Sequence, residues 1–170
     1  MKKFILATLL AFGLMTSAQA VDMASFDKEI AQKMINSSIQ VFPLAEDIGV
    51  EDAIESMQLR ANILNFKMVA DLPLSEQVIS MGEDARYMRI LAFCDALIAK
   101  KMVEFNPIFA GFLPCRIAVI EGADGKGMLV TMNMDMMLHA VDLPEDIKPL
   151  AVKVRDNIYS IVDAGVNGDL

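Results

Sequence analysis

The sequence predicts an α+β fold formed by a single compact domain, and three observations support this class. Helical stripes of apolar residues alternate along the chain with short apolar runs typical of strands. Two such runs, 115–121 and 128–134, flank the turn residues Asp124-Gly125 and therefore predict a β-hairpin. No repeat, low-complexity tract or linker divides residues 21–170. We therefore expect a mixed sheet with helices packed on it.

The first 20 residues have the pattern of a secretory signal peptide. Lys2 and Lys3 give a positive start, residues 4–15 are apolar, and Ala18 and Ala20 supply the small residues of a cleavage site. This apolar run is shorter than the roughly 20 residues that a spanning helix needs. We expect a mature chain that begins at Val21, lies in the periplasm or outside the cell, and has no membrane span.

The mature chain is acidic. Two of the 15 Lys and Arg residues and none of the 23 Asp and Glu residues lie in the signal segment, so the charge falls from −8 to −10 on cleavage. An acidic chain without a long basic run lacks the attraction that draws proteins to nucleic acid, so we expect no such partner. His139 is the only histidine, which excludes a zinc site built from several imidazoles of one chain.

The amino-terminal half begins with a short helix. Phe26, Ile30 and Met34 recur every four residues after Ser25, a suitable N-cap, and predict a helix over 25–36. The elements expected next are an edge strand over 39–44 containing Pro43, a helix over 51–64 with an acidic first turn, a strand over 66–72, and an ambiguous polar segment over 75–84.

The carboxy-terminal half carries the clearest patterns. Residues 87–93 form a nearly continuous apolar strand, and Asp95 then caps a helix that stops at Asn106-Pro107. The hairpin follows. The last element is an amphipathic helix over about 144–164, whose apolar positions run from Ile147 to Ile161 in steps of three and four, with Pro149 in its first turn and Gly165 at its end.

Cys94 and Cys115 are the only thiols, and they form the first candidate site. A disulfide enclosing about 20 residues could stabilise the protein by roughly 3 kcal/mol. If residues 87–121 formed a parallel crossover, however, the cysteines would lie beyond the ~7 Å reach of a disulfide, unless residues 106–114 rerouted the chain. A disulfide, inert buried thiols and a functional thiol all remain open. Cys94 precedes a helix start, which favours its thiolate, whereas Asp95 opposes it.

Methionine is unusually frequent and forms the second candidate site. Thioether and imidazole ligands, which together with thiolate suit Cu(I), come from Met128, Met132, Met134, Met136, Met137 and His139, and the first choice among them is Met132, Met134, Met136 and His139. In an extended strand Met128, Met132 and Met134 would share one face. A buried sheet face explains the same spacing, so core packing is the favoured interpretation and copper the alternative.

The run from Arg86 to Met137 resembles the bacterial family called domain of unknown function 302. In that family a strand ends in a cysteine, an Ala/Leu-rich helix follows, and Leu-Pro-Cys opens a hairpin. Here residues 89–94, the helix after Asp95 and residues 113–115 fit this order. The resemblance implies a small α+β fold related to half of the TATA-binding-protein fold, often dimeric, with its core at about 39–141.

Two positions depart from the family pattern. Asp95-Ala96 stands where Asn-Pro is common after the first cysteine, and Arg116 stands where Asn follows the second. Roles of those amide side chains are therefore not carried over, while both cysteines are retained. The resemblance implies no established activity.

No motif indicates an enzyme or a particular cofactor. No nucleophile elbow accompanies His139, and the glycines of 122–127 join two strands, whereas a phosphate-binding loop opens a helix. We expect a non-enzymatic binding or accessory domain that uses the Cys94/Cys115 region for a small ligand, a metal ion or a periplasmic protein. The alternatives are a thiol-based redox or sulfur-carrier protein with Cys94 as reactive thiolate, and a purely structural homodimer.

Overall fold

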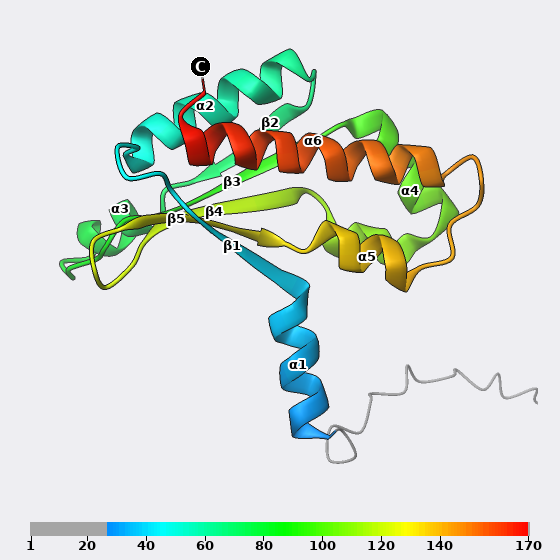
Figure 1. Cartoon of the computed structure of the whole chain (residues 1–170), viewed down its shortest axis with the longest axis horizontal. Coiled ribbons are helices and arrows are strands. Elements are labelled where there is room, and N and C mark those ends of the chain that lie inside the picture. The colour runs from blue at the N-terminus through cyan, green and yellow to red at the C-terminus, as the bar shows by residue number, and fades with distance from the viewer. Residues whose placement is uncertain (1–26, 170) are drawn as a thin grey trace, which may run out of the picture.

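The computed structural model describes residues 27–169, which form a five-stranded sheet with helices packed against it (Figure 1). The predicted signal peptide, Val21 and Ser25 lie outside the described residues. Within them, no helix is both long and apolar enough to cross a membrane. The elements are α1 (Lys28–Ser38), β1 (Ile39–Pro43), α2 (Val50–Ile63), β2 (Lys67–Leu72), α3 (Leu74–Ser80), β3 (Met88–Cys94), α4 (Ala96–Phe105), the 3-10 helix η2 (Pro107–Phe112), β4 (Cys115–Glu121), β5 (Gly127–Met132), α5 (Met134–Ala140) and α6 (Lys148–Asn167).

The strands follow the order β1-β5-β4-β3-β2, and every neighbouring pair is antiparallel. The α+β class is confirmed, but the expected mixed sheet is wrong, and β3 and β4 do not form a parallel crossover. After α4, Asn106 begins η2 by accepting a hydrogen bond from the backbone N–H of Ile108. Through η2 the chain returns to the end of the sheet that it left. As a result, Phe93 lies opposite Cys115.

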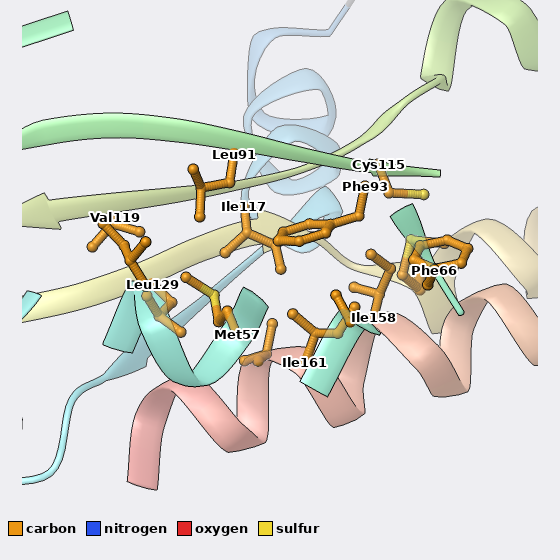
Figure 2. Packing of buried hydrophobic residues seen from close by; sticks show 14 residues of the cluster. Met57, Phe66, Leu91, Phe93, Cys115, Ile117, Val119, Leu129, Ile158 and Ile161 are labelled. Atoms are coloured by element: carbon orange, nitrogen blue, oxygen red, sulfur yellow. The ribbon is translucent and has the colours of Figure 1, made fainter. Parts of the chain in front are cut away.

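One face of the sheet packs against α2 and α6 (Figure 1). Figure 2 shows the contact, in which Leu91, Phe93 and Ile117 of the sheet meet Met57 of α2 and Ile158 of α6. These five side chains are fully buried. This layer holds the largest part of the core, because alternate residues of each strand point toward the helices.

The sequence prediction that Gly165 ends the last helix is wrong. Gly165 lies within α6, where an added Cβ would come 2.7 Å from Cγ of Met57 and 3.0 Å from Cδ1 of Leu129. The glycine therefore allows α6 to pack closely on α2 and the sheet. The helix ends at Gly168, which adopts the left-handed conformation with φ of 67°.

Two other boundaries differ from the sequence prediction. The hairpin strand β5 ends at Met132, because Asn133 accepts a hydrogen bond from the backbone N–H of Met136 and caps α5. Met134 thus lies in a helix and not in the strand. The polar segment at 75–84, which the sequence left unassigned, is largely helical, because α3 extends over Leu74–Ser80. By contrast, the predicted cap of α4 is confirmed, since the Asp95 carboxylate accepts from Leu97 and Ile98.

Replacing Ile158 by Asp should destabilise the protein by about 3 kcal/mol or more, because it would bury an unpaired charge between α6 and the sheet. Chemical denaturation measures the change. Ile63→Asp is the matched control, because Ile63 is 75% exposed at the end of α2, and its loss should stay below about 1 kcal/mol. Equal losses in both variants would contradict the packing of α6 described above.

Candidate functional site

The two cysteines lie at the same end of the sheet. Cys94 is the last residue of β3, and Cys115 is the first residue of β4. Cys115 is buried on the core face opposite Phe93, while Cys94 is half-buried, and both are free thiols. The antiparallel register thus removes the geometric separation that a parallel crossover would have imposed.

The surroundings of both thiols favour the neutral form. Burial raises the pKa of the Cys115 thiol to about 11, and Cys94 nearby adds to this, while Arg116 opposes it. Burial also raises the pKa of Cys94, and the Asp95 carboxylate raises it further. The amides at the start of α4 therefore do not give Cys94 the low pKa of a reactive thiolate.

A cavity of about 70 Å³ adjoins the cysteines, and its walls are almost entirely apolar. Phe66 and Phe93 form the wall toward the main core, and Figure 2 shows them beside Cys115 at one end of that core. Other lining residues belong to a second cluster of buried side chains, in which α4, η2 and α6 meet. These residues are Ile98, Met102, Phe109 and Ala151.

Sulfur atoms are concentrated in this cavity. Both cysteines line it, and methionines from α4, β5 and α5 join them. These methionines are Met102, Met132, Met134 and Met137. The two candidate sites of the sequence therefore meet in part, although they were predicted as separate features.

The rest of the predicted copper set lies elsewhere. Met136 is not among the residues that line the cavity. His139 is exposed, and its Nδ1 lies 2.8 Å from the carbonyl oxygen of Asp135 on the same helix. Among the described residues, no three His, Cys, Asp or Glu side chains gather as a metal site.

Sequence reasoning missed the contribution of the segment 107–112. These residues were interpreted as the stop of the preceding helix and as part of a connection that could reroute the chain, whereas Phe109 and Phe112 both line the cavity. Two aromatic residues spaced by three, after a proline, are the signal that could have indicated a helical turn with one apolar side. Met102 was likewise not predicted as a site residue, whereas Met137 belonged to the methionine cluster of the sequence prediction.

The best-defined polar cluster of the described chain has a structural role. Arg89 of β3 donates two hydrogen bonds of 2.7 Å to the carboxylate of Asp71 on β2. This contact lowers the pKa of Asp71 and raises that of Arg89, so both stay charged. Glu51 accepts a hydrogen bond from the Tyr87 hydroxyl beside them. Because Arg89 and Asp71 are hydrogen-bonded to each other, the ion pair links β3 to β2, and its charged groups are occupied by this contact.

Comparison with known proteins agrees with this fold. A family model described as domain of unknown function DUF302 matches residues 43–165. No curated protein matches the chain. The fold is similar to the crystal structure of an uncharacterized conserved protein DUF302 from Bacillus stearothermophilus, with a TM-score of 0.61 and 18% identity. That similarity covers 74% of this chain and 96% of the other. Because the family model spans well over half of the sequence, the chain belongs to the DUF302 family.

Proposed function

We propose that the protein is an exported, non-enzymatic binding domain that holds a small apolar ligand in the cavity beside Cys94 and Cys115. The observation that carries this proposal is the cavity itself, whose lining residues are apolar apart from Asp95 and the two cysteines. Export is inferred from the pattern of residues 1–20.

The size of the cavity limits what it can hold. Its volume of about 70 Å³ is roughly half that of an engineered apolar cavity of about 150 Å³ that binds benzene in another protein. A group of a few carbon atoms therefore fits without rearrangement. Phe112 lines the cavity and is itself partly exposed, so a longer ligand could place its apolar end inside and its remainder in solvent.

Thiol chemistry is the less favoured alternative for the same region. A redox or sulfur-carrier protein needs a thiolate at neutral pH, and the pKa values of both cysteines are raised. The neutral thiols instead add polarizable, weakly polar surface to the cavity wall.

Cu(I) binding is a second candidate, because the two cysteines and four methionines that line the cavity are soft sulfur ligands. Binding through Cys94 and Cys115 would release their protons, so affinity would rise with pH. Under this candidate, stoichiometric Cu(I) binding in an anaerobic titration is lost in Cys115→Ser and kept in His139→Ala. Absence of such binding in the wild type removes the candidate.

The apolar-ligand proposal can be tested with 1-pentanol as the probe and the methionine methyl groups as reporters in NMR spectra. Resonances of Met134 and Met137, which line the cavity, should shift and saturate. The methyl group of Met81, which is exposed on the surface, should not follow them. Shifts of equal size at all three residues, or none at saturation, would contradict the proposal.

Two alanine variants test the place of binding in this titration, one in the cavity wall and one as its matched control. Ala99→Leu adds a larger side chain to the cavity wall and should abolish the saturable shift. Ala140→Leu makes the same change at an exposed position near the end of α5 and should leave the shift intact. Retention of binding by Ala99→Leu would place the ligand elsewhere.

The raised pKa of Cys94 predicts slow alkylation by iodoacetamide at pH 7 relative to free cysteine. Only the thiolate reacts with iodoacetamide, so the alkylation rate should increase about tenfold per pH unit while the pH stays below the raised pKa. Mass spectrometry of the Cys115→Ser variant over pH 6–10 measures the alkylation rate of Cys94. A rate that levels off below pH 8 would instead support a reactive thiolate and the carrier function.

A further inference from the structure

Asp95 is the one charged residue among those that line the cavity. It is half-buried, follows Cys94 directly and stands at the start of α4. In ligand sites, a polar group on an otherwise apolar wall fixes the orientation of the ligand and selects its head group. The chemistry of Asp95 therefore decides which of the small apolar molecules that fit the cavity are preferred.

The protein itself uses only part of the Asp95 carboxylate. Oδ1 accepts hydrogen bonds from the backbone N–H of Leu97, at 3.0 Å, and of Ile98, at 3.1 Å. Within the part of the chain that the structure describes, no group donates to Oδ2 and no cation forms an ion pair with Asp95. A carboxylate oxygen has two lone pairs, so Oδ2 can accept hydrogen bonds from a ligand.

The negative charge of Asp95 reaches the cavity. Burial, and then the Asp95 carboxylate, raise the pKa of the Cys94 thiol, which lines the same cavity. Arg116 lies nearby on β4, but it is exposed, and the alternation of side chains places it on the sheet face away from the core. Water therefore screens Arg116 more than it screens the half-buried Asp95.

The start of α4 does not provide a site for an anion. Helix starts bind anions through backbone N–H groups that lack a partner. Here the N–H groups of Leu97 and Ile98 donate to the Asp95 side chain, and that of Ala99 donates to the Asp95 carbonyl oxygen at 2.9 Å. A ligand with a carboxylate head would meet a like charge and donors that are already occupied.

We propose that the cavity selects short amphiphiles with a primary ammonium head, and that Oδ2 of Asp95 accepts hydrogen bonds from this head. The inference rests on the proposed function, because the alkyl chain of such a ligand occupies the apolar cavity. An ammonium group carries three donors and a positive charge, which match the unused oxygen and the negative charge of Asp95. Because Asp95 is only half-buried, the ammonium group keeps part of its hydration, which limits the cost of desolvation.

Three pentyl compounds that differ only in the head group test this selectivity at pH 7. They are pentylamine, 1-pentanol and pentanoate, and the methyl resonances of Met134 and Met137 report their binding. An alkylamine is protonated at this pH, as the lysine side chain is. Pentylamine should bind about tenfold more tightly than 1-pentanol, because a charge-assisted hydrogen bond is roughly twice as strong as a neutral one. Pentanoate should bind about tenfold more weakly than 1-pentanol, because Asp95 repels it.

Asp95→Asn removes the charge and keeps the helix cap, since Asn caps helices about as well as Asp. Its melting temperature should fall by no more than about 4 °C. In this variant pentylamine and 1-pentanol should bind with about equal affinity. Asp27→Asn is the matched control, because Asp27 caps α1 through the same pair of hydrogen bonds and does not line the cavity. Asp27→Asn should keep the preference for pentylamine.

The outcomes separate this inference from the proposed function. Equal affinities of pentylamine and 1-pentanol in the wild type, or a preference that persists in Asp95→Asn, would overturn the ammonium selectivity and leave the apolar cavity site standing. Tighter binding of pentanoate would also overturn it and would assign head-group recognition to Arg116. Absence of saturable shifts with all three compounds would overturn both the selectivity and the proposed function.

Discussion

The antiparallel pairing of β3 with β4 is the constraint on which the candidate site depends. It places Phe93 opposite Cys115, so the last residues of β3 and the first residues of β4 lie at the same end of the sheet. The chain between the two strands has to leave that end and return to it. Helix α4 and η2 therefore stack beyond the strand ends, and the cavity is enclosed between them, α5 and α6. Neither the cavity nor the proximity of the two cysteines would exist in a parallel crossover.

Much of the fold could be predicted from local patterns. The bounds of β4 and the Asp95 cap agree with the sequence prediction, because strand periodicity and capping depend on neighbouring residues. Strand direction could not be predicted in this way, since it depends on how residues 106–114 route the chain. Gly165 shows a similar limit. A glycine at the end of an apolar stripe resembles a helix stop, whereas its role here comes from the tertiary contact with Met57.

The candidate site was predicted in part for the same reason. The cysteines were identified by their rarity, and Met132 and Met134 by their clustering in sequence. The participation of Met102 and Phe109 depends on the packing of α4 and η2, which no spacing in the sequence reveals. Met136 and His139 do not line the cavity, because Asn133 starts a helix, which ends the strand periodicity before Met136. Burial then decides the chemistry: it raises the pKa of both thiols and thereby favours a binding role over a reactive one.

The central claim is that an apolar cavity beside the cysteine pair accepts a small guest. Diffraction from crystals of the protein under xenon pressure tests it most directly, because xenon occupies apolar cavities without requiring a particular functional group. The account predicts a xenon peak in contact with Cys115, Met134 and Ile98, and weaker occupancy in Ala99→Leu. Well-diffracting crystals with no xenon at this position, or with side chains that fill the space, would contradict it.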